Sequence, residues 1–460
     1  MTRFATETDA VTYIFSSLAR FDWQHRGFDE KTRNPAPTQR LLQMHNLLAQ
    51  RREYAVVTGS KGKGSVTVFT SNLLKHLGHT VGTVTSPHLV SYRERIRVNG
   101  RAISPEDFLR LVETFAPSID EIQSDLGEGQ YLSPQGIFLA MALKYFDEQG
   151  VDAAVIEVGR GGRYDDNALV PNMLALFTPM ILEHTRYLGP TLERIAWHKA
   201  GIIKPQSYAY SLPQAPEVMN VLLREAEMLG AEFAFIARND MGLLLAETAD
   251  GMQVDFGRYG VVNLPFLGRY EIDNASLAII AAGNMHARLD GVPHASSAYI
   301  EGIRAGLESL RWPGRCQKLQ DAPAVYLDGA INTMSVDILL RSLQSRLKSP
   351  VVVVTAVPRD RDIAAVYGRL AQVADAVVLT GTTRNVTIHF PDAATAVPAM
   401  RDALAAAGRA DVPVQYVDSA PRAVDAAVAL AGREGTVLVT VAQPVIGDIF
   451  EDRGLVYEQL

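Results

Sequence analysis

Cysteine is nearly absent from this sequence, since Cys316 is the only one among 460 residues. A single cysteine can form neither an intramolecular disulfide nor a metal site built from several cysteines, which is typical of the reducing cytosol. The chain also lacks an uninterrupted apolar stretch of the roughly 18–20 residues that cross a membrane. Its first seven residues include an acid and no apolar core of signal-peptide length. We therefore expect a cytoplasmic protein with no membrane partner.

Basic residues are also in short supply, because 44 Lys and Arg stand against 51 Asp and Glu and give a net charge of −7. General binding to nucleic acid or anionic membranes usually requires a basic surplus or basic runs, so neither is expected. The charge balance does not bear on a small local phosphate site. With 47% hydrophobic and 21% charged residues, the composition is that of a globular protein. The length predicts about two to four domains.

Short apolar runs alternate with helix-like segments along most of the chain, which predicts an α/β fold with a parallel sheet covered on both faces. Residues 8–50 are expected to be helical around a loop at 22–39, and residues 207–265 to be β-rich. The other expected strands of the first half are 54–58, 80–85, 151–158 and 173–178, and the expected helices are 66–77, 137–146, 192–199, 274–285 and 297–310.

A second α/β series follows Trp312-Pro313-Gly314-Arg315, where Pro and Gly interrupt the pattern. We expect a domain boundary near residue 313, with an N-terminal domain at 1–313 and a C-terminal domain at 314–460. The expected strands of the second domain are 324–327, 351–356, 376–380, 414–417 and 436–441.

The most informative segment reads Gly59-Ser60-Lys61-Gly62-Lys63-Gly64-Ser65, between an apolar run and a helix. Glycines let successive backbone N–H groups converge on one anion, and the following helix N-terminus adds partial positive charge. The segment differs from the common pattern G-x-x-x-x-G-K-[ST], because Gly64 separates Lys63 from Ser65. The segment therefore favours a phosphate loop, although a glycine-rich surface turn would have the same composition.

Further motifs follow this segment in a fixed order. They are Thr85-Ser86-Pro87-His88-Leu89, Arg93-Glu94-Arg95-Ile96, Glu157-Val158-Gly159-Arg160-Gly161-Gly162-Arg163, Glu183-His184-Thr185, Lys199-Ala200-Gly201-Ile202-Ile203-Lys204-Pro205, Gly268-Arg269-Tyr270 with Asn274, Trp312-Pro313-Gly314-Arg315, and Asp328-Gly329-Ala330. Together with the glycine-rich segment, this series resembles the folylpolyglutamate synthase/dihydrofolate synthase branch of the Mur ligase superfamily.

That resemblance implies a P-loop, Mur-ligase-like ATPase domain followed by a smaller Rossmann-like domain, with ATP in the cleft between them. It implies an ADP-forming ligase that activates a carboxylate as an acyl phosphate and couples it to an amino acid, with L-glutamate and a folate or pteroate as the expected substrates. The expected cofactors are ATP and Mg²⁺ at two sites, and the expected state is a monomer.

Site residues are also implied by the resemblance. Residues Gly59 to Ser65 would bind phosphate, Lys63, His184 and Lys199 would be catalytic, and Lys199 would carry a carbamate that organises the second Mg²⁺. The metal set would be Ser86, Glu157, His184 and Lys199, and ATP would also meet Asn274 at its adenine, Arg315 at its phosphates and Asp328 at its ribose.

The residues taken singly allow other readings. Glu157 ends an expected strand, where open α/β sheets place ligand sites, and this position favours a functional acid. His184 alone could be an ordinary loop histidine, Lys199 could lie on the solvent face of a helix, and Asp328 could form a turn after its strand.

Several segments depart from the family pattern on the acceptor side. Ser133-Pro134-Gln135-Gly136 replaces a T-F-F-E-like segment, Ile331 stands in place of His, and Thr440-Val441-Ala442-Gln443 replaces a T-G-S-like strand end. Residues 23–30, Trp-Gln-His-Arg-Gly-Phe-Asp-Glu, could line an aromatic-anion pocket or form an ordinary amphipathic loop. By contrast, Asp360-Arg361-Asp362 is similar to a D-K-D-like family segment.

Three hypotheses remain from the sequence. The first is a folylpolyglutamate or dihydrofolate synthase. The second is a sister ligase with the same mechanism and another carboxylated acceptor or amino acid. The third is a non-catalytic nucleotide-binding module, which the joint presence of Lys63, Glu157 and Lys199 makes the weakest, because a switch needs no carbamate lysine.

Overall fold

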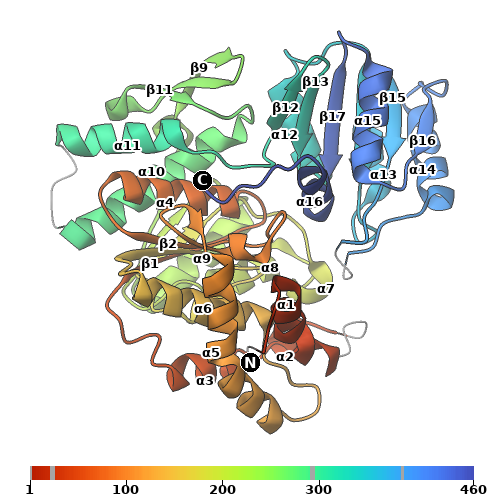
Figure 1. Ribbon diagram of the computed structural model, residues 1–460. Coiled ribbons are helices and arrows are strands. Elements are labelled where there is room, and N and C mark those ends of the chain that lie inside the picture. Colours follow the sequence, from red (N-terminus) through yellow and green to blue (C-terminus); the bar gives the residue numbers. More distant parts are fainter. Residues whose placement is uncertain (1–2, 21–25, 291–295, 385–387) are drawn as a thin grey trace.

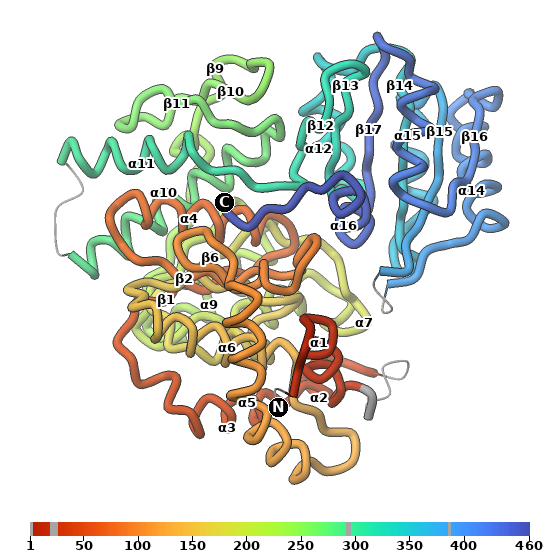
Figure 2. Tube along the Cα trace, in the orientation of Figure 1, coloured from red at the N-terminus to blue at the C-terminus, as the bar shows by residue number. Residues whose placement is uncertain are grey.

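The computed structural model describes residues 3–20, 26–290, 296–384 and 388–460. In these ranges the chain forms two lobes, each built on a mostly parallel sheet (Figure 1), so the predicted α/β class is confirmed. Figure 2 shows the same chain as a trace, with the blue C-terminal lobe beside the red-to-green N-terminal lobe. None of the described helices is long and apolar enough to cross a membrane.

The N-terminal lobe contains an eight-stranded sheet in the order β4-β3-β2-β5-β1-β6-β7-β8. The adjacent strands β2, β5, β1, β6, β7 and β8 are parallel, while β3 and β4 are antiparallel at one edge. The central strands are buried on both faces, which explains their continuous apolar runs. Their bounds are β1 Glu53–Thr58, β2 Val81–Val84, β3 Ile96–Val98, β4 Arg101–Ala102, β5 Ala153–Glu157, β6 Leu174–Phe177, β7 Tyr208–Ser211 and β8 Glu232–Phe235.

Helices cover both faces of this sheet and bury two separate apolar cores. One core holds side chains of α1, α3, α5, α6, α8 and α9, and the other holds side chains of α4, α10 and α11. The helices are α1 Glu7–Phe15, α2 Asp29–Thr32, α3 Ala36–Met44, α4 Lys63–His76, α5 Pro105–Asp125, α6 Pro134–Glu148, α7 Thr185–Leu188, α8 Leu192–Ala200, α9 Pro216–Leu229, α10 Tyr270–Asp290 and α11 Ser297–Ser309.

Two expectations for the first half were wrong in part. The loop expected at 22–39 contains α2 and the beginning of α3. Pro37 lies in the first turn of α3, where a missing N–H costs no intrahelical hydrogen bond, so the proline begins a helix here. The stretch 207–265 holds the long helix α9 besides its strands, among them a three-stranded antiparallel sheet of β9 Leu243–Thr248, β10 Gly251–Asp255 and β11 Val261–Leu264.

The C-terminal lobe contains a six-stranded sheet in the order β12-β13-β17-β14-β15-β16, parallel except for β12. The five strands expected here are confirmed. The elements are β12 Gln317–Asp321, β13 Ala324–Asp328, α12 Thr333–Leu343, β14 Val351–Ala356, α13 Ile363–Leu370, β15 Ala376–Leu379, α14 Ala393–Ala406, β16 Val414–Tyr416, α15 Ala420–Ala431, β17 Thr436–Val441 and α16 Gln443–Asp452.

The C-terminal end of the chain returns to the N-terminal lobe (Figure 1). The buried Arg97 guanidinium donates hydrogen bonds to the backbone carbonyls of Tyr457 and Glu458 at 2.8 and 3.0 Å. The backbone N–H of Leu460 donates to the carbonyl of Gly100 at 3.1 Å. The two lobes are therefore joined twice, and the domain boundary near residue 313 stays a prediction.

Candidate active site

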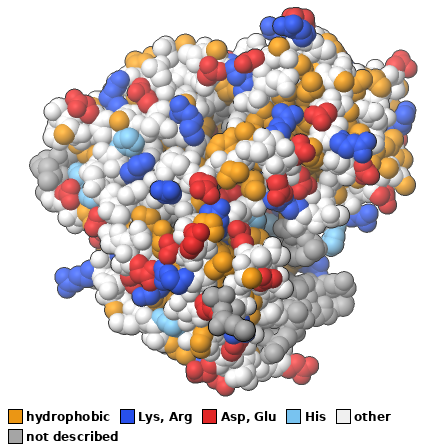
Figure 3. Space-filling model, in the orientation of Figure 1, with side chains coloured by type: hydrophobic (Ala, Val, Ile, Leu, Met, Phe, Trp, Pro, Cys, Tyr) orange, Lys and Arg blue, Asp and Glu red, His pale blue; other side chains and the backbone are white. Residues whose placement is uncertain are grey.

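A cavity of about 480 Å³ lies where the carboxyl end of β1 and the N-terminus of α4 face the C-terminal lobe. Parallel strands place their carboxyl ends at one sheet edge, and loops at that edge form the usual ligand site of such folds. The face shown in Figure 3 carries acidic and basic side chains interspersed. Among the predicted site residues, the cavity is lined by Ser60, Lys61, Gly62, Lys63, Gly64, Ser65, Ser86, Glu157, Asn274, Arg315 and Asp328.

The glycine-rich loop requires glycine at two of its positions. At Gly59, with φ +145°, a Cβ would lie 1.9 Å from Thr178 Oγ1. At Gly62, with φ +87°, a Cβ would lie 2.5 Å from Asn274 Oδ1. Helix α4 begins at Lys63, immediately after this turn, and so presents its free N–H groups and its positive dipole end beside the cavity. The alternative of an exposed surface turn is excluded, because the loop is packed between β1, Thr178 and α10.

Positive charge gathers at this loop. Lys61 and Lys63 line the cavity from the N-terminal lobe, and Arg315 and Arg361 line it from the C-terminal lobe. Burial lowers the pKa of Lys61 to about 8, partly offset by the nearby Glu183 carboxylate. Three of these four cations influence the pKa of Lys61, which indicates that they share one small region. An anionic ligand would relieve this mutual repulsion.

Glu157 is the acid that faces the loop. It ends β5 beside β1, and the Ser86 backbone N–H donates a 3.0 Å hydrogen bond to its Oε2. Burial raises the pKa of Glu157, while the Lys63 charge and this hydrogen bond lower it. A Cβ on Gly64 would lie 3.5 Å from Glu157 Oε2, so the carboxylate points toward the start of α4. Ser86 and Glu157 thus lie together, as the sequence predicts.

Glu271 is a site residue that the sequence reasoning missed. Its Oε1 accepts a 2.8 Å hydrogen bond from Ser65 Oγ, and its Oε2 accepts a 2.9 Å bond from Asn274 Nδ2. The side chain is completely buried, and burial raises its pKa to about 7. It joins the phosphate-loop serine to the predicted adenine residue. The available signal was its place between Gly268-Arg269-Tyr270 and Asn274, in the first turn of α10.

Asp328 ends β13 and brings the C-terminal lobe into the site. Its Oδ2 accepts hydrogen bonds from Tyr270 Oη at 2.8 Å and from the Cys316 backbone N–H at 2.7 Å. Burial raises the pKa of Asp328, and the positive charge of Arg315 opposes that rise. The buried carboxylate also accepts a hydrogen bond from the backbone N–H of Ala330, so Asp328 forms a turn after its strand as well, and its contact with ribose stays a prediction.

Lys199 and His184 lie outside the lining of the cavity. Lys199 is fully buried beneath the glycine loop, where Nζ donates to the carbonyls of Gly59 at 2.7 Å and Arg160 at 2.9 Å. Glu183 Oε1 lies 4.0 Å from that amine. Burial, reinforced by the Lys63 charge, lowers the pKa of Lys199 to about 7. A solvent-facing lysine is therefore excluded.

His184 precedes α7 in the left-handed backbone region, with φ +52°. Burial lowers its pKa to about 3, against the opposing effect of the Glu183 carboxylate. The imidazole is consequently neutral at physiological pH, the form in which histidine binds metals. The catalytic and metal-binding roles of His184 and Lys199 stay predictions.

The segment 23–30 is described only in part, since Trp23, Gln24 and His25 lie outside the described residues. Asp29 is buried and pairs with Arg26 at 3.0 Å and with Arg160 at 2.7 Å. This segment therefore contacts the turn that follows β5, through the ion pair of Asp29 with Arg160. The choice between an acceptor pocket and a structural loop stays open.

The segment 133–136 begins α6 and packs against α3. A Cβ on Gly136 would lie 2.0 Å from Thr38 Oγ1, which itself donates a 2.6 Å hydrogen bond to Asp166. Where the family has aromatic and acidic residues, this chain thus has a segment whose Gly136 packs tightly against Thr38.

Comparison with known proteins agrees with this geometry. The Mur ligase middle domain matches residues 57–282, and the Mur ligase glutamate ligase domain matches residues 314–442. The chain is 34% identical to the dihydrofolate synthase/folylpolyglutamate synthase of Bacillus subtilis over 70% of this chain and 74% of that protein. It is 31% identical to the Mycobacterium tuberculosis protein of the same name over 88% and 87%.

A solved structure of M. tuberculosis folylpolyglutamate synthase, complexed with ADP and AMPPCP, covers 97% of this chain and 99% of its own. It has a TM-score of 0.81 and 26% sequence identity. The fold of both lobes is thus shared with a protein solved in complex with ADP and AMPPCP. The chain belongs to the folylpolyglutamate synthase/dihydrofolate synthase branch of the Mur ligase superfamily, and it is an ATP-dependent ligase.

Proposed function

We propose that this ligase joins the amine of L-glutamate to a carboxylate of a folate or pteroate and forms ADP and phosphate. The observation that carries the proposal is the convergence of Lys63, Glu157 and Arg315 on one cavity between the lobes. The names of the relatives supply the substrate class. A site of this kind suits a reaction in which two anionic substrates must meet.

The proposed chemistry has two steps. An oxygen of the acceptor carboxylate attacks the γ-phosphorus of ATP, the bond to ADP breaks, and an acyl phosphate forms. The amine nitrogen then attacks the acyl carbon, phosphate leaves, and the nitrogen loses a proton. Lys61, Lys63 and Arg315 would offset the negative charge that accumulates in the first step. Enclosure between the lobes would protect the acyl phosphate from water.

Mg²⁺ fits the donor set of this cavity, because Glu157 and Ser86 offer the hard oxygen atoms that it prefers. Several cations lie near the buried Glu157 carboxylate, as expected of a site where a carboxylate, a metal ion and phosphate groups would come together. His184 would complete the set through a neutral nitrogen, directly or through water. The bound ion would neutralise phosphate charge.

Lys199 fits the proposed carbamate. A pKa of about 7 leaves much of its amine unprotonated at neutral pH. That nitrogen can attack the carbon of CO₂ and lose a proton, which yields a carbamate anion among Lys61, Lys63 and the proposed metal. The free amine donates two hydrogen bonds to backbone carbonyls, and carbamate formation would disrupt them. The carbamate anion would then help to hold a second Mg²⁺.

Another acceptor is favoured by one observation. Residues 133–136 are Ser-Pro-Gln-Gly and so supply no aromatic or acidic side chain for a pterin, and Gly136 packs tightly against Thr38. A sister ligase with a different carboxylated acceptor, or with another amino acid in view of Ile331 and Gln443, is therefore the second candidate. Its ATP chemistry would be the same.

We also propose that residues 1–313 and 314–460 are the two domains and that the chain works as a monomer. Each range carries its own parallel sheet and its own apolar cores, which supports the division. Residues 57–313 and 314–328 supply all the predicted residues that line the cavity, so one chain suffices for the site.

A phosphate-release screen tests the proposed substrates. The protein is incubated with ATP, Mg²⁺ and pairs of acceptor and amino acid, including dihydropteroate and tetrahydrofolate with glutamate. We expect release that requires a pterin acceptor and glutamate together, and loss of that release in Lys63→Ala. Release with other acceptors and with no pterin would replace the folate proposal by the second candidate.

A further inference from the structure

Helices α4 and α10 are fastened to each other at both ends. At their N-termini, beside the cavity, Ser65 donates its hydrogen bond to Glu271. At the other end, His79 Nε2, just beyond the last residue of α4, lies 2.8 Å from His286 Nδ1 of α10. About 22 Å of helix separates Glu271 from His286, at a rise of 1.5 Å per residue. The histidine contact is therefore remote from the nucleotide cavity, although it holds the same two helices.

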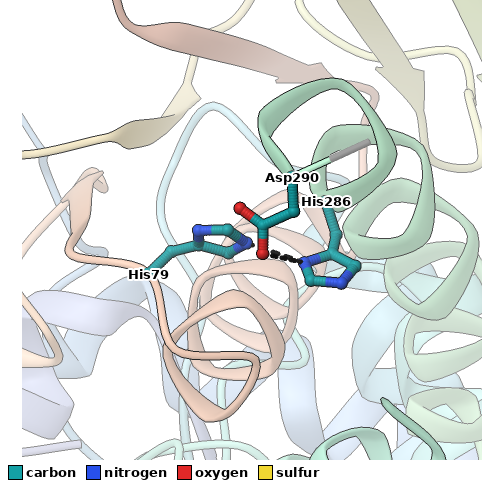
Figure 4. A group of neighbouring side chains, drawn as sticks. All are labelled: His79, His286 and Asp290. Atoms are coloured by element: carbon teal, nitrogen blue, oxygen red, sulfur yellow. Dashed lines mark hydrogen bonds and ion pairs between the residues drawn. The ribbon is translucent and has the colours of Figure 1, made fainter. Parts of the chain in front are cut away.

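A carboxylate completes this remote group. Asp290 lies one helical turn after His286, and its Oδ2 is 3.5 Å from His286 Nδ1. One nitrogen or oxygen from each of the three side chains lies within 4.8 Å of the others. Figure 4 shows the His79 ring and the Asp290 carboxylate approaching His286 from two different elements. His79 belongs to the connection between α4 and β2, whereas the other two belong to α10.

The two histidine rings are held in place by packing. Both residues are 8% exposed, and their rings meet edge-on with centroids 5.1 Å apart. The Tyr299 ring of α11 stacks on His286 at 5.5 Å with an interplanar angle of 27°. The Asp290 side chain is 43% exposed, so one side of the group is open to water. Such a group is rigid on its protein side and accessible from solvent.

The three facing atoms also suit a metal ion. His286 Nδ1 faces both His79 Nε2 and Asp290 Oδ2. A carboxylate oxygen only accepts, so a single proton on His286 Nδ1 would have to be shared between His79 Nε2 and Asp290 Oδ2. A cation accepts lone pairs from all three atoms. Ligand atoms around tetrahedral Zn²⁺ lie about 3.3 Å apart, given bonds of about 2.0–2.1 Å, and the observed 2.8 and 3.5 Å bracket that value.

We propose that His79, His286 and Asp290 form a binding site for a divalent transition metal ion of the Zn²⁺ class, with water as the fourth ligand. Two imidazoles and one carboxylate favour Zn²⁺, Co²⁺ or Ni²⁺ over Mg²⁺. The site is separate from the ligase chemistry. Its effect is to tie the α4–β2 connection to the end of α10 and so stabilise the helix pair that carries Ser65, Glu271 and Asn274.

Cobalt binding to the full-length protein tests this site. Saturating Mg²⁺ and ATP are kept present, so that the nucleotide cavity is filled while Co²⁺ is added. We expect one Co²⁺ per chain with the intense visible absorption of a four-coordinate ion, and its displacement by Zn²⁺. His79→Gln and Asp290→Asn should each weaken Co²⁺ binding at least about tenfold.

His45→Gln is the matched control, because His45 is a partly buried histidine bonded to Ser118 on another part of the fold. Its Co²⁺ affinity should equal that of the unchanged protein. Zn²⁺ should raise the melting temperature of the unchanged protein and of His45→Gln but not of Asp290→Asn, whose exposed position keeps the fold intact. The proposal is overturned by the lack of a four-coordinate spectrum, by equal affinities in the cluster variants and the unchanged protein, or by an equal loss in His45→Gln.

Discussion

Ser65 Oγ donates a 2.8 Å hydrogen bond to a carboxylate oxygen of Glu271, and this bond joins the first turn of α4 to the first turn of α10. Glu271 is completely buried and also accepts a hydrogen bond from Asn274. The glycine loop, its serine and the predicted adenine residue are thus held in one arrangement by an acid that contacts two of them. The relationship explains how residues far apart in the sequence form one edge of the cavity.

Replacing Glu271 by Gln should change how stability depends on pH. The folded protein keeps a proton on Glu271 up to a pH of about 7, while the unfolded chain releases it near its ordinary pKa of 4.5. The folded state binds more protons between those values, so the contribution of Glu271 to the free energy of unfolding falls as pH rises through that window. Relative to Glu271→Gln, the unchanged protein should lose on the order of 3 kcal/mol of unfolding free energy between pH 4 and pH 8.

Denaturant unfolding at a series of pH values measures this effect. Glu227→Gln is the control, because Glu227 is an exposed acid on α9. The free energy of unfolding of this variant should change with pH in the same way as that of the unchanged protein. A parallel curve for Glu271→Gln as well would contradict the account of a buried, protonated carboxyl.

Gly62→Ala should impair nucleotide binding beyond its cost in stability. The new methyl group would lie 2.5 Å from Asn274 Oδ1 and so push the loop away from α10. Gly78→Ala has a similar backbone strain, with φ +95°, and no atom within 4 Å of the added carbon. Both should lose about 1–2 kcal/mol in stability. Only Gly62→Ala should raise the KM for ATP, by about 10–100-fold. Equal KM values in both variants would show that the loop tolerates a side chain.

Lys199→Ala should lower turnover by about 100-fold or more if the buried amine carries a negative carbamate beside the phosphates. A short carboxylic acid such as acetate should restore part of the activity, because it can occupy the space and supply the missing charge. Lys204→Met is the control, since Lys204 is a partly buried lysine whose Nζ also donates to a backbone carbonyl, that of Ala168. Acetate should leave that variant unaffected, and an unimpaired Lys199→Ala enzyme would rule the carbamate out.

Asp29→Asn should destabilise the protein far more than the loss of an exposed ion pair does. Asp29 is buried with Arg26 and also pairs with the partly buried Arg160, so its neutralisation removes the carboxylate that both guanidinium groups contact. The expected loss in unfolding free energy is about 3–5 kcal/mol. Asp120→Asn removes a pair with Arg3 in which both side chains are nearly half exposed, and it should cost less than about 1 kcal/mol. Similar losses in the two variants would contradict the structural role given to Asp29.

Most of the sheet strands could be predicted because burial on both faces turns a parallel strand into an apolar run, as in Val351–Ala356 and Glu53–Thr58. Two long helices, α5 and α9, were not expected from the sequence. The segment 22–39 failed because two prolines look like a loop, whereas Pro37 lies in a helical first turn. The low helix propensity of proline was outweighed by position, because Pro35 is the N-cap of α3 and Pro37 lies in its first turn.

Much of the cavity could also be predicted, since Lys63, Glu157 and Asp328 each follow or end an apolar strand, and the strands of the two sheets end at the same cavity. Two features could not. Glu271 acts through its contacts with Ser65 and Asn274, and such pairing across the chain leaves no local pattern. Lys199 belongs to a motif, yet its place beneath the loop depends on how α8 packs against the backbone of Gly59 and Arg160.

The central claim is that ATP activates the acceptor as an acyl phosphate, and oxygen transfer tests it most directly. The acceptor that supports phosphate release is prepared with ¹⁸O in its carboxylate, and the phosphate formed during ligation is analysed by mass spectrometry. The account predicts one ¹⁸O atom in each phosphate released, because the carboxylate oxygen that attacks the γ-phosphorus leaves with it. Unlabelled phosphate formed during productive ligation would contradict the account.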